Sequence, residues 1–501
     1  MNKTLAAKFH RLSDLFRYFV SQSRNAISLL GIGITSFSAL LILVLFFMDV
    51  MGYISNPYAG IVSYLILPFF FLLGLFLIPI GIWWAKKLRR NREAAGESIA
   101  ETCYPSWDFN DYRVRKTAVF VIVATVANVV ILSTATYKSI HYMESVEFCG
   151  TVCHTVMKPE HTAYLASPHS RVACTSCHIG PGAPWFVRSK LSGVRQVFAV
   201  TFKSYSRPIS TPVHNLRPAR ETCEQCHWPE KFEEAKVRVF RKFSDDEKNT
   251  PLTTALVLKV GGAHDKAGNG SGIHWWHMDP VNQVTYLADE KRQTMYRVQH
   301  KNAKGTTTEY ELAEGNLPPQ ELSRLEKRVM DCVDCHNRPT HIYRLPEESV
   351  DMAIANGQID PSLPFIKKQS VTLLKAQYSS QAEAGDKIRS GLQEFYSKEF
   401  AQLAPSDMPI EAARVEAAAK VLREIYSRNV FPEMKVTWGS YPNNLGHQNF
   451  PGCFRCHDEN HKSKDGKTIS QDCSACHDLL AVDEEKPALI PELIQKSGPS
   501  N

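Results

Sequence analysis

The most apolar parts of this 501-residue sequence contain no acidic or basic side chain. Three stretches are long enough to cross a bilayer, which takes about 20 mainly apolar residues. They cover residues 27–48, 61–85 and 117–137, and none of them holds a His, Lys, Arg, Asp or Glu. They therefore lack ligands for a membrane-embedded b-type haem and groups for an intramembrane proton relay. The sequence predicts three transmembrane helices without a redox role.

Positive charge is distributed unevenly around these stretches. The leader 1–26 and the segment 86–92 are strongly basic, whereas residues 49–60 contain no Lys or Arg. The first apolar run is too long for the core of a cleaved signal peptide, so we expect it to be retained. Because cytoplasmic segments carry an excess of Lys and Arg, the leader and the loop 86–116 are expected in the cytoplasm. Everything after Tyr137 is then expected in the periplasm of a bacterium, anchored to the inner membrane.

Cysteine is scarce outside one repeated pattern. The spacing Cys-x-x-Cys-His occurs five times, and six motifs that include a longer variant use 12 of the 13 cysteines. In this pattern two thiols bond to the vinyl groups of a haem and the following imidazole binds its iron. A zinc site or a disulfide framework does not require a His after every second Cys. The sequence predicts five c-type haems.

A sixth c-type haem is predicted at Cys149-Gly-Thr-Val-Cys153-His154, where three residues separate the thiols. Cys103 is left without a role. The predicted attachment residues are Cys149, Cys153, Cys174, Cys177, Cys223, Cys226, Cys332, Cys335, Cys453, Cys456, Cys473 and Cys476. The predicted proximal iron ligands are His154, His178, His227, His336, His457 and His477.

The formal net charge of +7 does not indicate a nucleic-acid partner. Six haems would add about twelve propionate carboxylates, which reverse the sign of the charge. We expect no nucleic acid among the partners.

The part after the apolar stretches divides into three regions. Residues 138–230 hold three motifs, and residues 326–501 hold three more around a mostly helical connection, 346–429. Between them, residues 231–325 alternate apolar and polar side chains in five short runs with Gly-rich turns, which is typical of strands. The predicted fold is three N-terminal transmembrane helices followed by a mainly helical and irregular multihaem cytochrome c domain with a β-rich insertion.

Residues 185–198 predict an amphipathic helix. Val187, Leu191, Val194 and Phe198 recur at helical spacing, with cations at intervening positions. Such a helix suits a membrane interface, and it equally suits packing against haems. The sequence leaves both open.

Twelve histidines lie outside the motifs, and imidazole is a good iron ligand. Several of them are therefore expected to supply the second axial ligand of a haem. For the first haem, Met157 and His161 compete as the nearest candidates.

The stretch 148–200 resembles the NapC/NirT/NrfH family of membrane-anchored multihaem quinol dehydrogenases. The likeness rests on Cys-His followed by Met157, on Ser167-Pro-His169, and on Val172-Ala-Cys-Thr-Ser-Cys-His178. It implies that Met157 ligates the haem next to the quinol, that His169 ligates a different haem, and that Lys190 lies at the quinol site. The first motif is one residue longer than in that family, and no acid stands at residues 195–197, where the family has an aspartate.

The remainder is similar to larger inner-membrane cytochromes of the ImcH type, which pass quinol electrons outward in metal respiration. This likeness implies that His341 and His447 are distal iron ligands. His214, His274 and His277 are further candidates.

The resemblance implies a quinol dehydrogenase that passes electrons from menaquinol or ubiquinol in the bilayer to periplasmic cytochromes or a reductase, in anaerobic or metal respiration. Candidates for the quinol site are Lys190, Glu160 and His161, since quinol oxidation needs a proton acceptor. Two alternatives remain open. One is a terminal reductase of a small oxidant such as nitrite or hydroxylamine, and the other is a passive electron-transfer subunit of a larger complex.

Overall fold

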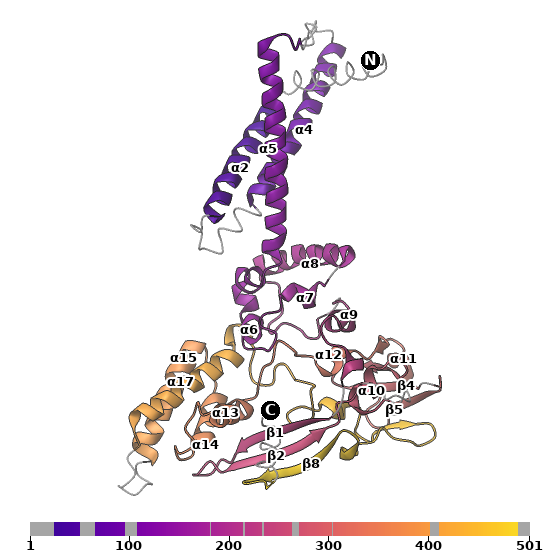
Figure 1. Ribbon diagram of the computed structural model, residues 1–501, viewed down its shortest axis with the longest axis vertical. Coiled ribbons are helices and arrows are strands. Elements are labelled where there is room, and N and C mark those ends of the chain that lie inside the picture. The colour runs from indigo at the N-terminus through magenta and orange to yellow at the C-terminus, as the bar shows by residue number, and fades with distance from the viewer. Residues whose placement is uncertain are drawn as a thin grey trace, which may run out of the picture. The chain divides into compact units, whose positions relative to one another are not determined.

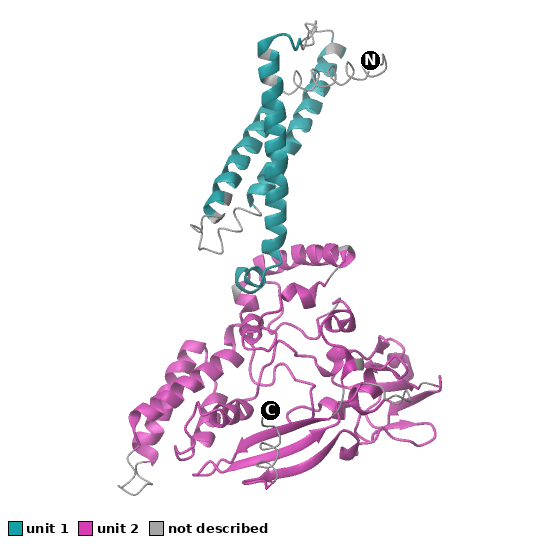
Figure 2. Ribbon diagram, in the orientation of Figure 1, with its two compact units in different colours: residues 1–152 teal, residues 153–501 magenta. Residues whose placement is uncertain are grey.

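The computed structural model describes residues 25–50, 66–95, 108–180, 182–213, 216–232, 235–262, 270–302, 304–400 and 410–488. The chain divides into two compact units, residues 1–152 and 153–501 (Figure 2). The boundary falls inside the first cysteine motif, because Cys149 belongs to the first unit and Cys153 begins the second.

The first unit contains three long helices, α2 (Ala26–Val50), α4 (Leu67–Ala94) and α5 (Tyr112–Met143) (Figure 1). Each is long and apolar enough to cross a membrane, over Ala26–Leu45, Leu67–Arg92 and Val114–Met143. The prediction of three apolar helices is confirmed. The basic segment 86–92 continues α4 as helix, and the leader before residue 25 lies outside the described residues.

Small residues allow α2 and α4 to pack closely. A Cβ atom added to Gly31 would lie 2.7 Å from the carbonyl oxygen of Gly74, so neither position has room for a side chain. Nearby, the Ser28 hydroxyl donates to the carbonyl of Ile78 at 2.9 Å. Close backbone approach at small residues is the usual way in which membrane helices associate.

The second unit begins with four helices in the region of the second and third cysteine motifs. They are α6 (His154–Leu165), α7 (Cys174–His178), α8 (Ala183–Thr201) and α9 (Ala219–Cys223). The predicted amphipathic helix is confirmed as α8. The side chains of Val187, Leu191, Val194 and Phe198 are all exposed on it.

Two antiparallel sheets follow, and all five predicted strands are confirmed. The strands are β1 (Lys236–Phe243), β2 (Pro251–Leu258), β3 (Gln283–Ala288), β4 (Met295–Lys301), β5 (Thr307–Leu312), β6 (Arg328–Val329), β7 (His461–Ser463) and β8 (His477–Glu484). One sheet has the order β1-β2-β8 and the other β6-β3-β4-β5-β7. A short helix, α10 (Gly272–Met278), connects them.

The sheets extend beyond the predicted insertion. β7 and β8 come from the segment that carries the last two motifs, and they pair with β5 and β2. β8 begins at the motif histidine His477 itself. Residues 231–325 therefore do not form a separate sheet domain, because the C-terminal motif segment completes both sheets.

The predicted helical connection is a compact group beside the three-stranded sheet (Figure 1). It consists of α13 (Pro346–Ala355), α14 (Ile366–Lys375), α15 (Gln381–Glu394), η4 (Phe395–Glu399) and α17 (Ala412–Asn429). Its core is apolar and contains fully buried Ile388, Leu392 and Leu422. A buried ion pair of 2.5 Å joins Lys367 to Asp351 at its edge.

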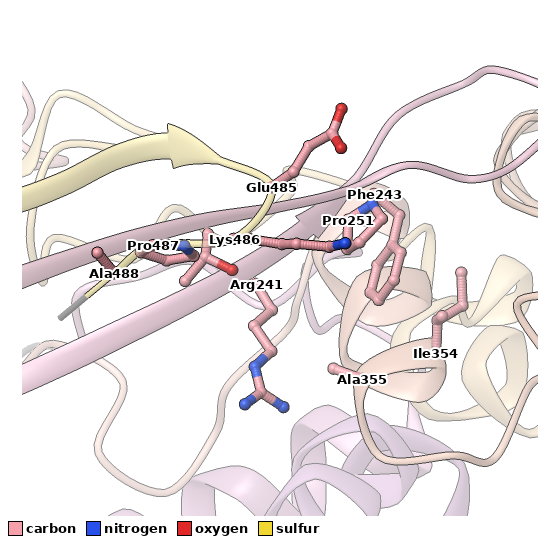
Figure 3. Close-up of a pocket in the computed structure, with 10 residues that line it drawn as sticks. Arg241, Phe243, Pro251, Ile354, Ala355, Glu485, Lys486, Pro487 and Ala488 are labelled. Carbon is pink, nitrogen blue, oxygen red and sulfur yellow. The ribbon is translucent and has the colours of Figure 1, made fainter. Parts of the chain in front are cut away.

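A hollow of about 620 Å³ lies where this helical group meets β1, β2 and the residues after β8. Figure 3 shows Phe243 and Ile354 on one side of it and Lys486 on another. Its lining contains none of the residues that the sequence predicts to bind haem or quinol.

We expect the helical group to be stabilised by its own core. Replacing Leu392 with Ala should reduce local stability by roughly 2–5 kcal/mol, because it leaves a cavity among closely packed side chains. Faster amide hydrogen exchange in α15 and α17, followed by mass spectrometry, measures this loss. Met352→Ala, at a position that is 40% exposed on α13, is the control and should change little. Equal exchange in L392A and wild type would contradict the prediction.

Candidate haem sites

Each of the five regular motifs forms a short helical turn. Four of these turns are α7, α12 (Cys332–Cys335), η6 (Gly452–Arg455) and η7 (Cys473–Ala475). The turn of the third motif follows α9, with the His227 amide donating to the Cys223 carbonyl at 2.8 Å. In the fourth motif the His336 amide donates to the Cys332 carbonyl at 2.8 Å, which closes one turn. A helical turn brings residues i, i+3 and i+4 to the same side. The spacing Cys-x-x-Cys-His thus presents two thiols and one imidazole together.

The longer first motif contains a wider turn. Residues Phe148–Val152 form a π-helical turn, η2, which includes Cys149. A π turn closes its hydrogen bond one residue later than an α turn. The π turn therefore accommodates the additional residue between the two cysteines of this motif. His154 begins α6, and its side chain lies outside the described part of the chain.

Every motif histidine whose side chain is described faces a second histidine from outside the motifs. The ring centres of these pairs are separated by 5.9 to 6.3 Å. The pairs are His178 with His341 at 6.2 Å, His227 with His169 at 6.0 Å, His336 with His274 at 6.3 Å, His457 with His277 at 5.9 Å, and His477 with His447 at 6.2 Å.

This separation fits two imidazoles on opposite sides of one iron. With metal–nitrogen bonds of about 2 Å on each side, the two ring centres lie about 6 Å apart. The ring separations of five predicted distal candidates, His169, His274, His277, His341 and His447, thus match those expected for two axial ligands of one iron. The residues present fit c-type haems with two histidine ligands.

Hydrogen bonds to backbone carbonyls orient five of these ten rings. A carbonyl can only accept, so the ring Nδ1 must carry the proton and Nε2 keeps its lone pair for a metal. The bonded pairs are His169 with Pro339 at 3.3 Å, His274 with Val260 at 3.2 Å, His277 with Ile273 at 2.7 Å, His341 with Glu160 at 3.0 Å, and His457 with Ser470 at 2.8 Å.

Burial keeps several of these rings neutral, which is the form that binds metal. It lowers the pKa of His341 to about 4 and also lowers the pKa of His178, its opposite ring. The same cause lowers the pKa values of His274, His277 and His336. At neutral pH these imidazoles carry no charge.

The five regular motifs follow one another in space in the order of the sequence. The pKa of Cys177 is raised by burial and by the nearby Cys223, which links the second motif to the third. A hydrogen bond that the Cys332 thiol donates to Cys223 is the main cause that raises the pKa of Cys332, in the fourth motif, and it lowers the pKa of Cys223.

The same succession continues to the C-terminal motifs. Burial and then the proximity of Cys453 raise the pKa of Cys335, to about 11. Burial and the same Cys453 raise the pKa of Cys476, in the last motif. Each regular motif therefore lies close to the next one in the sequence, and we call this succession of motifs the row.

Glu160, a predicted quinol-site residue, is largely buried on α6. Its carboxylate lies 3.7 Å from the Arg338 guanidinium and 3.1 Å from Nδ1 of His341. Burial raises the pKa of Glu160, and the positive charge of Arg338 partly offsets this effect. Arg338 in turn lies 4.0 Å from the centre of the Tyr441 ring.

The other predicted residues of the first haem and the quinol site lie on two helices. His161 and the half-buried Met157 are on α6, where the His161 ring stacks on Tyr164 at 6.3 Å. Lys190 is on α8, with its ammonium group 4.6 Å from the centre of the Phe186 ring. His214 lies outside the described residues.

One further histidine in the C-terminal region has a structural role instead. His461 is fully buried, with Nδ1 2.8 Å from an Asp458 carboxylate oxygen and Nε2 2.7 Å from the Met295 carbonyl. Both nitrogens face acceptors, so neither is free for a metal. The sequence does not separate His461 from His341, since each follows a motif histidine by a few residues.

Two buried residues inside the motifs escaped the sequence analysis. Asp334 and Arg455 stand at the same position, directly before the second Cys, in the fourth and fifth motifs. Arg455 donates to the Asp334 carbonyl at 2.5 Å and to the Arg292 carbonyl at 2.6 Å. The Asp334 carboxylate accepts from the Tyr286 hydroxyl at 2.5 Å. The sequence signal that could have identified Asp334 and Arg455 is a charged residue between the two cysteines of a motif.

Comparison with known proteins agrees with this architecture. Residues 112–211 match the model of the NapC/NirT cytochrome c family, N-terminal region. Over 469 residues the chain is 45% identical to the cytochrome c-type protein ImcH of Geobacter sulfurreducens, covering 93% of this chain and 90% of that protein. No solved structure matches the chain. The chain therefore belongs to the NapC/NirT cytochrome c family, as a membrane-anchored, multihaem electron-transfer protein of the ImcH type that binds haem c covalently.

Proposed function

We propose that this cytochrome oxidises quinol in the inner membrane and delivers the electrons to periplasmic acceptors. The observation that carries the proposal is the row of five histidine pairs, which begins after an apolar three-helix unit. When bound, the haems supply one-electron transfer, and their close succession permits transfer from one end of the row to the other.

The residues of the chain hold and orient these groups. We assign six haems, attached by the twelve motif cysteines, with His154, His178, His227, His336, His457 and His477 as proximal ligands. The distal ligands follow from the pairs: His341 for the second motif, His169 for the third, His274 for the fourth, His277 for the fifth and His447 for the sixth. For the first motif we retain Met157 and His161 as the nearest candidates, and His214 as a further distal candidate.

Two ligands on each of five irons argue against reduction of a small oxidant such as nitrite or hydroxylamine at these haems. That chemistry needs an open position on the iron. The described pairs favour electron transfer instead.

Quinol would bind beside α8 and the first motif. The apolar side chains of α8 are exposed, from Val187 at 55% to Leu191 at 69%, and Arg188 and Arg195 lie between them. We propose that this face meets the bilayer and its headgroups, which suits an amphipathic helix with cations. Lys190 would then donate a hydrogen bond to a quinol oxygen. Glu160 or His161 would accept a proton, since two protons leave with the two electrons.

Orientation follows from the basic segments. With the leader and residues 86–116 in the cytoplasm, the second unit lies in the periplasm, where c-type haems are attached and other cytochromes or a reductase can accept electrons.

Lys190→Ala should slow the reduction of the haems by a menaquinol analogue by roughly 10-fold to 100-fold. A hydrogen bond from a charged group contributes about 1.5–3 kcal/mol, which corresponds to this factor. Stopped-flow absorbance of the anaerobic, detergent-solubilised protein measures the rate. Lys368→Ala, which removes an exposed cation on α14 in the haem-free helical group, is the control and should reduce at the wild-type rate. If wild-type haems stay oxidised with quinol while dithionite reduces them, the chain is not a quinol dehydrogenase.

His447→Ala should open one coordination position on the haem of the last motif. The reduced wild type should bind little carbon monoxide at its five paired irons, and the variant should bind about one further equivalent per chain. Absorbance titration with carbon monoxide measures this. His300→Ala serves as the control, because the His300 ring faces Trp276 at 6.0 Å and not a motif histidine. No additional binding in H447A would overturn the assignment of this pair.

A further inference from the structure

The β-rich insertion contains no cysteine motif, yet it contributes two of the histidines that face motif histidines. Both come from α10, a helix of seven residues with the sequence Gly-Ile-His-Trp-Trp-His-Met. His274 and His277 are three positions apart, so they project from neighbouring positions on one side of the helix. Their partners are His336, in the fourth motif, and His457, in the fifth.

The geometry of the two pairs shows that they are separate. The rings of His274 and His336 are nearly parallel, at 7° and 6.3 Å, whereas those of His277 and His457 are inclined by 59° at 5.9 Å. Each ring of α10 also has its own backbone acceptor, Val260 for His274 and Ile273 for His277. The two rings therefore face different motif histidines, with their Nε2 atoms free.

The end of β2 holds α10 in place. The amides of Ile273 and His274 donate to the carbonyls of Lys259 and Val260 at 2.9 and 3.0 Å. Gly261 and Gly272 have φ angles of +52° and +81°, and a Cβ atom on Gly272 would lie 2.7 Å from the Gly261 Cα. Only glycine permits this contact, because other residues are strained at positive φ and would collide.

The fourth and fifth motifs are also joined to each other by a hydrogen bond. The Arg455 guanidinium, within the fifth motif, donates to the Asp334 carbonyl within the fourth. Buried Asn444 adds a bond to the same carbonyl at 3.4 Å. The Asp334 carboxylate is in turn bonded to Tyr286 on β3, in the insertion. Tyr286 of the insertion and Arg455 of the fifth motif thus both bond to buried Asp334 of the fourth motif, the first to its carboxylate and the second to its backbone carbonyl.

We infer that α10 is a bridging helix that supplies one axial ligand to each of two successive haems, His274 to the haem of the fourth motif and His277 to the haem of the fifth. The role of the insertion is then to hold these two irons at a fixed separation in the middle of the row. This inference rests on the proposed function, since it uses the assignment of the facing histidines as haem ligands.

Carbon monoxide titration of His274→Ala, His277→Ala and the double variant tests the inference. Each single variant should open one iron, and the double variant should open two. If both histidines served one iron, the double variant would bind no more than either single variant. That result would overturn the bridging role. His300→Ala, within the same insertion, should bind as the wild type does.

Two conservative variants provide a second measurement, in which every iron keeps an axial ligand and the fold is preserved. A thioether still ligates haem iron, and it raises the reduction potential relative to imidazole. His274→Met and His277→Met should therefore keep all haems low-spin and shift the potential of one haem upward in each variant. Potentiometric titration followed by electron paramagnetic resonance should show two different haems shifted. The same haem shifted in both variants, or none, would contradict the inference.

His447→Ala separates this inference from the proposed function. One new site in H447A with none in H274A or H277A would reject the bridging helix and leave the paired-histidine haems intact. No new site in any of the three variants would reject the ligand assignment itself.

Discussion

The second unit depends on the approach of two imidazoles to about 6 Å from each other, a distance that one metal between them explains. Each of the five described pairs joins segments that are far apart in the sequence, such as His178 with His341 and His277 with His457. A haem that is bonded to one segment and ligated by another acts as a cross-link between them. Metal ligation of this kind contributes directly to folding.

The distribution of buried apolar residues agrees with this view. The largest apolar core belongs to the haem-free helical group and includes Ile388, Leu392 and Leu422. In the described part of residues 153–230, by contrast, the buried apolar residues are only Val156, Ala163, Tyr164 and Ala219. A segment with so small a core cannot offset its conformational entropy by side-chain burial alone. In the proposed arrangement, covalent attachment to haem and ligation to its iron would supply the missing stabilisation.

The motifs also use their variable positions to contact one another. The residue before the second Cys is Asp334 in the fourth motif and Arg455 in the fifth, and both are buried. Arg455 donates three hydrogen bonds to backbone carbonyls, of Gly452, Arg292 and Asp334. A buried guanidinium without such acceptors would be costly. The charged residues within the motifs thus set the separation of neighbouring attachment turns, which electron transfer along the row requires.

The sequence by itself determined the features that depend on local pattern or covalent chemistry. The six cysteine motifs, the three apolar helices, the five strands of the insertion and the helical connection that begins at Pro346 and ends at Asn429 could all be predicted. Their signals lie within a few residues, as thiol spacing, hydrophobic period or proline position. The distal histidines were predicted partly from a resemblance, and for most of them the sequence did not indicate which motif they serve.

Only the tertiary structure decided which histidine faces which motif, that β7 and β8 complete the sheets, and that His461 is a buried structural residue and not a ligand. These outcomes depend on contacts between segments that are distant in the sequence, such as Met295 with His461. A histidine carries the same side chain whether its Nε2 faces an iron or a carbonyl. The surrounding fold determines which of the two the Nε2 atom faces, because it places either a motif turn or a backbone acceptor within reach of the ring.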